Sequence, residues 1–205
     1  MEKGNKIITI GREFGSGGRE LGKRIAENLG IAYYDGEIIT AIAKRSELAV
    51  SYVDQVLEKR IHAYYPITIA NSFAAHQGDA VGAVTRSIYT AQTEIIREMA
   101  EKSDCVIVGR CADHILAEYK PLRLFVYADL PSKMTRCREK HGEEGLTDRE
   151  LEKRIRQVDR DRAQYYRFYT GLTWGDRNNY DLCVNTTGLR LADVARLIAG
   201  MERSE

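Results

Sequence analysis

Apolar residues along this chain fall into two patterns: short continuous runs and longer stretches with helical spacing. The runs are rich in valine, isoleucine, leucine and tyrosine and alternate little with polar residues, which is typical of strands buried on both faces of a sheet. They lie at residues 6–10, 32–34, 105–108, 122–127 and 181–185. Because helical patterns separate the runs, the sequence predicts βαβ units and a mostly parallel sheet, with ligands at the carboxyl ends of its strands.

The helical stretches carry apolar stripes at helical spacing. They lie at residues 46–62, 84–99, 147–169 and 191–201. Residues 66–82 have weak periodicity and predict a loop. The third stretch begins with Thr-Asp-Arg-Glu at 147–150, a capping box in which Thr147 and Glu150 satisfy backbone N–H groups at the helix start. A basic stripe on this helix is either a solvated face or a face that grips phosphate with arginine forks. The stripe comprises Arg149, Lys153, Arg156, Arg160 and Arg167.

A glycine-rich turn follows the first predicted strand and leads into a helix. Residues 11–22 read Gly-Arg-Glu-Phe-Gly-Ser-Gly-Gly-Arg-Glu-Leu-Gly. The glycines let backbone N–H groups converge on an anion, and the helix dipole favours negative charge at that end. The standard P-loop signature is G-x-x-x-x-G-K-[ST], but here Gly18 holds the lysine position, and Arg19 and Glu20 stand where hydroxyls belong. The turn therefore predicts phosphate binding without the lysine most associated with it.

Composition limits the class of protein. A length of 205 residues suits one α/β domain with a small insertion. The charges nearly cancel, with 31 Lys and Arg against 30 Asp and Glu, which favours neither nucleic acid nor an anionic membrane as a partner. No apolar run approaches the roughly 20 residues of a membrane span, and the start lacks the apolar core of a signal peptide, so we expect a cytoplasmic protein. The four cysteines and four histidines show no ligand spacing, so we expect reduced thiols and no protein-bound transition metal.

Several motifs, taken in chain order, resemble the cytidylate kinase-like family, relatives of the bacterial cytidylate kinases within the P-loop nucleoside monophosphate kinases. They are Gly-Ser-Gly-Gly-Arg-Glu-Leu-Gly at 15–22, Tyr-Tyr-Asp at 33–35, Val-Ile-Val-Gly-Arg at 106–110, the arginine-rich helix, and Tyr-Asp-Leu-Cys-Val-Asn at 180–185. The resemblance covers nearly the whole chain. It implies a single α/β domain with a three-layer, P-loop NTPase-like parallel sheet, helices on both faces and an Arg-rich helical lid. The implied parts are a core of residues 1–45, 83–138 and 170–205, a monophosphate-binding insertion at about 46–82, and a lid at about 139–169.

The same resemblance implies which residues form the site. Residues 15–18 fall on the Gly-Ser-Gly-Lys of a cytidylate kinase. The implied ATP- and phosphate-binding set is Arg12, Gly15, Ser16, Gly17, Gly18, Arg19 and Glu20. The implied acceptor-binding set is Asp35, Arg110 and Asp159, and the implied catalytic arginines of the lid are Arg156, Arg160 and Arg162.

The departures from the family pattern raise specific expectations. Because Gly18 replaces the lysine, Arg19 is the first candidate to supply the missing charge and Arg12 the second, and Glu20 would bind Mg²⁺ in place of a hydroxyl. Cys111 stands where cytidylate kinases have an aspartate after the arginine, and Asp113 is the nearest acid. Cys111 is either a spectator or, beside the active edge of the sheet, a reactive thiol.

The resemblance implies ATP- and Mg²⁺-dependent phosphoryl transfer to a nucleoside monophosphate, with CMP or dCMP the first acceptors to try. The partners would be small nucleotides, and the chain would be a monomer or a homodimer. Two alternatives stay open: a nucleotide-binding sensor with weak or no catalysis, and an NAD(P)-binding short-chain dehydrogenase. The dehydrogenase is suggested by Gly11-x-x-x-Gly15-x-Gly17 followed by Asp35, but none of the 12 tyrosines has a lysine four residues later, as its catalytic pair requires. Asp35 could also simply cap the next helix.

Overall fold

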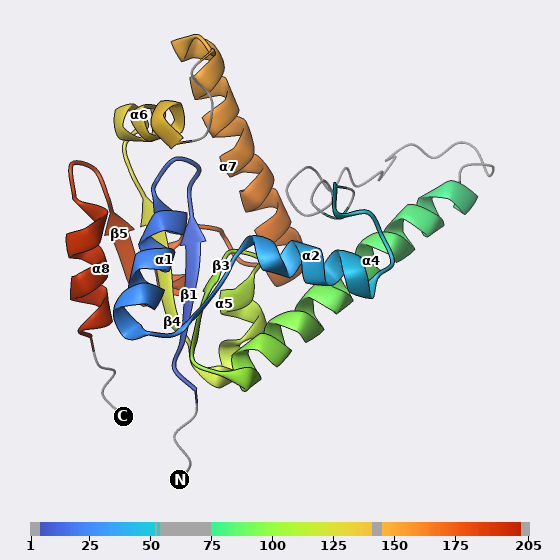
Figure 1. The fold of residues 1–205 in the computed structure, drawn as a ribbon. Helices are drawn as coiled ribbons and strands as arrows, with labels where there is room; N and C mark the ends of the chain where they lie inside the picture. Colours follow the sequence, from blue (N-terminus) through green and yellow to red (C-terminus); the bar gives the residue numbers. More distant parts are fainter. Residues whose placement is uncertain (1–4, 52, 54–74, 141–144, 202–205) are drawn as a thin grey trace.

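The computed structural model describes residues 5–51, 53, 75–140 and 145–201. Its centre is a five-stranded parallel sheet with the strand order β2-β3-β1-β4-β5 (Figure 1). The strands are β1 (Ile7–Arg12), β2 (Ala32–Tyr34), β3 (Cys105–Val108), β4 (Leu122–Tyr127) and β5 (Leu182–Asn185). All five predicted strands are confirmed. The first runs two residues further than predicted, so that Arg12 lies at the carboxyl edge of the sheet.

Helices surround the sheet and extend beyond its carboxyl edge. They are α1 (Gly18–Leu29), α2 (Gly36–Arg45), α4 (Ala75–Lys102), α5 (Ala112–Ile115), α6 (Leu130–Lys140), α7 (Asp148–Thr170) and α8 (Leu191–Ala199), with short 3-10 turns η1 (Ala117–Tyr119) and η2 (Arg177–Asn179). In Figure 1, α6 and α7 lie beyond the carboxyl end of the sheet, on the same side as the loop between β1 and α1.

Two apolar cores lie on opposite faces of the sheet, because successive residues of a strand point to opposite faces. Ile8 and Ile10 of β1 pack with α1 and α8 on one face. Ile7 of β1 and Ile107 of β3 pack on the other face with α2, α4, α5 and the last turns of α7. This arrangement confirms the predicted α/β fold with helices on both faces.

Two predictions from periodicity need correction or fall outside the described chain. The helix predicted at 46–62 and the loop predicted at 66–82 lie mostly in residues that the structure does not describe. Where the second of these is described, it is wrong, because α4 begins at Ala75 and runs for 28 residues. Weak apolar periodicity is therefore not sufficient evidence for a loop in this part of the chain.

The arginine-rich helix α7 begins as its capping box predicts. The side chain of Thr147 accepts a hydrogen bond from the backbone N–H of Glu150, whose carboxylate accepts one from the backbone N–H of Thr147 at 2.9 Å. The helix ends at Gly171, which has a left-handed φ of +72°. None of the helices within the described ranges is long and apolar enough to cross a membrane.

Candidate active site

The glycine loop between β1 and α1 has the shape of a phosphate-binding turn. Gly15 and Gly17 adopt φ angles of +74° and +84°, a region that glycine reaches without steric cost. A Cβ atom at Gly15 would lie 2.8 Å from the carbonyl oxygen of Lys133, and one at Gly17 would lie 2.8 Å from the side chain of Leu191. The glycines therefore let the loop pass closely between α6 and α8. The chain then enters α1 at Gly18, where the first backbone N–H groups have no acceptor within the helix.

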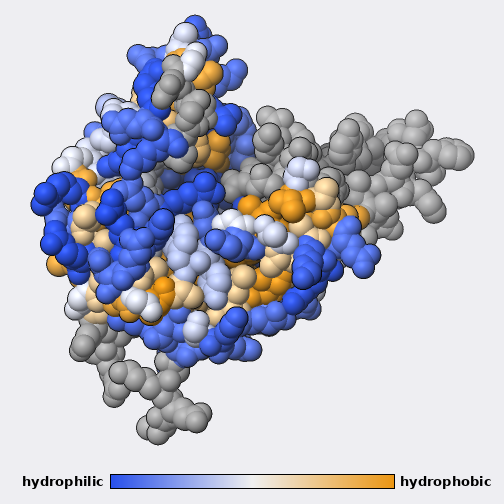
Figure 2. Space-filling model, viewed as in Figure 1, coloured by the Kyte–Doolittle hydropathy of each residue, from blue (hydrophilic) through white to orange (hydrophobic). Residues whose placement is uncertain are grey.

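A cleft of about 920 Å³ lies over this loop, with α6 and α7 as its walls; we call it the donor cleft. Its charged lining residues are Arg12, Glu13, Arg19, Glu20, Arg136, Lys140, Glu150, Lys153, Arg154, Asp161 and Arg162. Seven of these are basic and four acidic. Hydrophilic side chains surround the hollow in the space-filling view (Figure 2). An excess of basic groups around a glycine loop favours a polyanion such as a nucleotide triphosphate.

Only one face of α7 borders the donor cleft. Arg154 and Arg162, eight residues apart, lie on that face. Arg156 and Arg160 are exposed and line neither this cleft nor the cavity described next: Arg156 pairs with Glu152, and Arg160 donates to Gln157 at 2.8 Å. The structure thus brings Arg162 to the loop but not Arg156 or Arg160, whose catalytic assignment stays a prediction. Arg154 was missed, although its spacing of eight from Arg162 is a helical signal.

A second, smaller cavity of about 40 Å³ lies at the carboxyl edge of the sheet; we call it the arginine cavity. Arg12 of β1, Arg110 after β3 and Arg162 of α7 all line it. Arg12 and Arg110 are each only 7% exposed, and Arg162 donates from Nη1 to the carbonyl oxygen of Arg12 at 3.1 Å. Tyrosines 165, 166 and 180 and Trp174 complete much of its wall. Three arginines from distant parts of the sequence therefore line one small cavity.

The backbone around Arg110 is strained. Gly109, Arg110 and Cys111 have consecutive φ values of +76°, +58° and +54°. For the two residues that carry side chains, a left-handed conformation costs on the order of 1–3 kcal/mol each. Gln92 stabilises the turn by donating to the carbonyl oxygen of Arg110 at 3.0 Å. Such strain concentrates at functional sites, and here it directs Arg110 into the arginine cavity.

The acidic and thiol groups near the arginine cavity are shifted toward their neutral forms. Burial raises the pKa of Asp113, an effect that the hydroxyl of Tyr166, donating at 2.6 Å, offsets only in part. Burial also raises the pKa of the Cys111 thiol, which argues against a reactive thiolate at this position. Because burial disfavours the charged form of Asp113, this carboxyl is less able to neutralise the neighbouring arginines, and the cavity favours an anion.

Asp35 is bound to the arginines of the glycine loop. Its Oδ2 lies 2.7 Å from Nε of Arg19, and its Oδ1 lies 3.8 Å from Nη2 of Arg12. Asp35 directly precedes α2 but makes no side-chain capping hydrogen bond there. The interpretation of Asp35 as a simple helix cap is therefore not supported. The carboxylate instead links the loop to the start of α2.

Glu20 lines the donor cleft near the start of α1. Burial raises the pKa of its carboxyl, but hydrogen bonds from Lys140 and Arg24 outweigh that effect and leave the pKa below its ordinary value. The carboxylate is therefore charged at neutral pH and is already bound by two cations. A Mg²⁺ ion held by Glu20 would have to compete with them.

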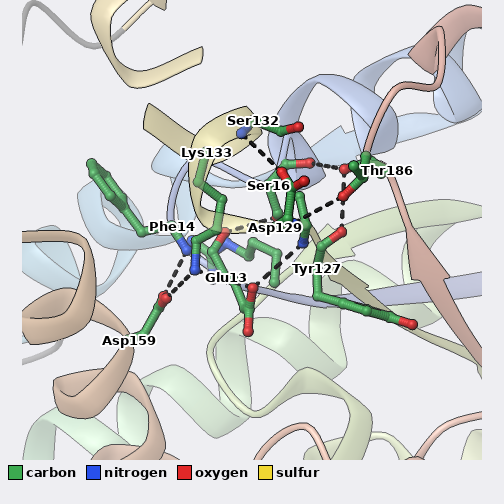
Figure 3. Close-up of polar contacts among 12 residues, drawn as sticks. Glu13, Phe14, Ser16, Tyr127, Asp129, Ser132, Lys133, Asp159 and Thr186 are labelled. Carbon is green, nitrogen blue, oxygen red and sulfur yellow. Dashed lines mark hydrogen bonds and ion pairs between the residues drawn. The ribbon is translucent and has the colours of Figure 1, made fainter. Parts of the chain in front are cut away.

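A buried lysine that sequence reasoning missed ties the loop to α6 and α7 (Figure 3). Nζ of Lys133 lies 2.6 Å from Oδ2 of Asp159 and 3.1 Å from Oε2 of Glu13, and its side chain is 8% exposed. The other oxygen of Asp159 accepts the backbone N–H of Phe14 at 2.7 Å. Asp159 lines neither the cleft nor the cavity. Asp159 links α7 to the glycine loop and to α6, and a part for it in binding the acceptor stays a prediction.

Ser16 lies behind the loop rather than in the cleft. It is fully buried, and its hydroxyl donates to the carbonyl oxygen of Glu13 at 2.8 Å. The hydroxyl of Thr186 donates to the carbonyl oxygen of Ser16 at 2.7 Å (Figure 3). Arg136 also donates to the carbonyl oxygen of Thr186 at 2.7 Å. These bonds fix the curvature of the loop from α6 and from the turn after β5.

The order of the strands bears on the dehydrogenase alternative. Dinucleotide-binding Rossmann folds have the strand order 3-2-1-4-5-6. Here β3 lies between β2 and β1, giving β2-β3-β1-β4-β5. The glycine pattern after β1 therefore lies in a sheet whose strand order differs from that of a Rossmann fold, and the structure does not support a short-chain dehydrogenase.

Comparison with known proteins agrees with this fold. The sequence model of the cytidylate kinase-like family matches residues 7–188. No curated protein matches the chain. Among solved structures, an uncharacterized protein from Eubacterium ventriosum is 28% identical, with a TM-score of 0.67 over 94% of this chain and 95% of that chain. The shikimate kinase of Acinetobacter baumannii, solved in complex with shikimate, is 15% identical, with a TM-score of 0.52 over 96% of this chain and 92% of that one. The protein TT1252 from Thermus thermophilus is 14% identical, with the same TM-score over 96% of each chain.

Proposed function

The chain belongs to the cytidylate kinase-like family, and on that premise we propose that it catalyses ATP- and Mg²⁺-dependent phosphoryl transfer to a nucleoside monophosphate. CMP and dCMP are the first acceptors to test. The observation that carries the proposal is the convergence of Arg12, Arg110 and Arg162 on a cavity that adjoins the donor cleft. Phosphoryl transfer needs two phosphate sites side by side and positive charge between them.

The two spaces suit the two phosphate groups. The triphosphate of ATP would lie on the glycine loop, against the first N–H groups of α1 and below Arg154 of the lid. The phosphate of the acceptor would meet Arg110 in the arginine cavity, whose Arg12 lies 3.8 Å from Asp35. Arg12 and Arg162 border both spaces, so their guanidinium groups would contact the phosphoryl group as it passes. Fixed donors aimed at developing charge are the largest single source of rate enhancement in such reactions.

Mg²⁺ would arrive on the β- and γ-phosphates of ATP and neutralise part of their charge. Glu20 is the carboxylate that the start of α1 offers to it, in exchange for Lys140 or Arg24. The lid would exclude water from the transfer, with Lys133 and Asp159 holding it over the loop.

The test is ADP formation by the purified protein with ATP and Mg²⁺, with CMP, dCMP, UMP, AMP and GMP as acceptors in turn. Turnover that one monophosphate stimulates, and that an Arg110→Ala variant loses, supports the proposal. A contaminating kinase would remain active in the Arg110→Ala preparation, so loss of turnover there assigns the activity to this protein. Lys23→Ala, on the exposed side of α1, is the matched control and should keep its turnover. Calorimetric titration of ATP is run in parallel. Tight binding of ATP without turnover on any acceptor would favour the nucleotide-binding sensor instead.

A further inference from the structure

The glycine loop differs from the standard signature at two positions, not one. In G-x-x-x-x-G-K-[ST] the first glycine lies five residues before the second, and the lysine directly follows the second. With Gly17 as the second glycine, the first-glycine position holds Arg12 and the lysine position holds Gly18. Compared with the standard signature, this chain has a basic residue at the first glycine position and a glycine at the lysine position.

The packing of the loop explains why the two changes go together. A Cβ atom built on Gly18 would lie 2.5 Å from Cβ and 2.9 Å from Cγ of Arg12, closer than real Cβ atoms approach. Gly18 has no left-handed φ, so space alone excludes a side chain there. Only one of positions 12 and 18 can carry a side chain in this loop. The standard signature gives the side chain to position 18, and this chain gives it to position 12.

The side chain of Arg12 reaches the place where the charge is needed. Its guanidinium lies so close to Gly109 that a Cβ atom there would overlap Nη1. From this position Arg12 borders both the donor cleft and the arginine cavity. Arg19, the other basic residue of the loop, has a side chain that is 53% exposed and is engaged by Asp35 at 2.7 Å. Arg19 borders the donor cleft but not the arginine cavity.

We propose that Arg12 replaces the P-loop lysine as the loop's phosphate-binding cation, and that it can do so only because position 18 is glycine. This inference rests on the proposed phosphotransferase function and names the residue that supplies its missing charge. The guanidinium would contact the transferred phosphoryl group from the sheet side of the loop. Its planar fork can donate two parallel hydrogen bonds to phosphate oxygens.

The experiment is a four-protein cycle of wild type, Arg12→Gly, Gly18→Lys and the double variant, which restores the standard signature. Each protein is measured for kcat, for ATP affinity by calorimetry and for the midpoint of thermal unfolding without nucleotide. Arg12→Gly is expected to lower kcat roughly 100-fold or more. Gly18→Lys is expected to lower the unfolding midpoint by roughly 3–10 °C, because the new side chain meets Arg12.

The double variant decides the inference. The unfolding midpoint of the double variant is expected to match that of Arg12→Gly. Its kcat is expected to be at least about tenfold above that of either single variant, since coupled sites deviate from additivity. Recovery of heat stability without recovery of kcat would overturn the assignment of the charge to Arg12. A midpoint as low as that of Gly18→Lys would overturn the steric exclusion.

The same four proteins distinguish a failure of the proposed function from a failure of this inference. If the wild type binds ATP but transfers no phosphoryl group, the phosphotransferase proposal fails, and the cycle is scored on ATP affinity instead. Arg12→Gly should then bind roughly tenfold or more weakly, and the double variant should recover that loss. Unchanged affinity in Arg12→Gly would overturn the inference. A wild type that neither binds ATP nor transfers phosphoryl overturns both.

Discussion

The donor cleft and the arginine cavity adjoin each other and share Arg12 and Arg162, yet they hold charge in different ways. In the cleft, charged groups are partly exposed and already paired with one another, as Glu20 is with Lys140 and Arg24. In the cavity, Arg12 and Arg110 are nearly buried and held by strained backbone and close packing. Exposed pairs exchange partners at little cost, whereas a buried guanidinium is fixed in place.

The difference suits two stages of one reaction. A cleft whose ion pairs can open admits a large, flexible triphosphate and releases its product. A cavity with fixed donors gains nothing from flexibility, because preorganised charge is what stabilises a transition state. For the proposed function, the comparison implies that the catalytic charge would lie mainly in the shared wall and the cavity, and less in the exposed arginines of α7.

The largest effect should come from the cluster that holds the lid to the loop. Lys133→Met leaves Glu13 and Asp159 without their shared cation, and we expect a loss of about 3 kcal/mol or more in the free energy of unfolding. Urea denaturation measures it. Arg45→Met, which breaks an exposed pair with Glu98, is the control and should cost much less, because exposed ion pairs contribute little to stability. Equal losses in the two variants would mean that the Lys133 cluster is no stronger than a surface pair.

Two arginines of the same helix test whether the shared wall matters more than the outer face of the lid. Arg162→Ala is expected to lower kcat roughly 100-fold, equivalent to about 2.7 kcal/mol, because its guanidinium borders both spaces. Arg160→Ala, two residues away and exposed, should have a much smaller effect. Steady-state kinetics with saturating ATP compares them. A larger loss for Arg160 would support the catalytic assignment of Arg160 made from the sequence and would contradict the comparison between the regions.

Alanine substitutions at two glycines distinguish the effect of backbone strain from the effect of displacing Arg12. Gly109 and Gly188 have similar left-handed φ values, +76° and +67°, but a Cβ atom at Gly109 would overlap Arg12, whereas one at Gly188 meets nothing within 4 Å. Gly188→Ala should cost about 1–2 kcal/mol of stability and leave kcat unchanged. Gly109→Ala should cost more and also lower kcat. Unfolding free energies and initial rates of both variants are needed, and a Gly109→Ala enzyme of full activity would contradict the position of Arg12.

The smallest effect is a pH dependence that sharpens the electrostatics of the cavity. Because burial raises the pKa of Asp113 in the folded protein, the folded state favours the protonated carboxyl. Its contribution to stability is complete below its ordinary pKa of 3.8 and is lost as the pH rises through the folded value. Wild type should therefore lose stability relative to Asp113→Asn above about pH 4, by up to about 1.4 kcal/mol per pH unit. Urea titrations of both proteins across pH 4–8 measure it; parallel curves would show that Asp113 is ionised at its ordinary pKa.

The sequence predicted those features that depend on neighbouring residues. Five apolar runs became the five strands, and the capping box at Thr147 opened α7 as expected. The glycine loop after β1 was found by its spacing, as was the absence of its lysine. These features are local, because backbone geometry and side-chain period are set within a few residues.

Other parts of the site could not be found in this way. Lys133 gave no signal, because its partners Glu13 and Asp159 lie 120 and 26 residues away in the chain. The basic stripe on α7 was visible, but the sequence could not tell which of its sides meets the loop, and it favoured Arg156 and Arg160 over Arg154. That choice depends on how α7 packs on α6 and contacts Arg12 at the end of β1.

The sequence by itself determined that this chain forms a parallel α/β sheet, with a glycine-rich loop after the first strand that lacks the lysine of the standard signature. Only the tertiary structure decided the position of Arg12, the residue that we propose as its replacement. The side chain of Arg12 packs against Gly18, in its own loop, and against Gly109, which follows β3. The physical reason is that a local pattern fixes the conformation of a segment, whereas the position of a charge depends on packing between segments that no single window of sequence contains.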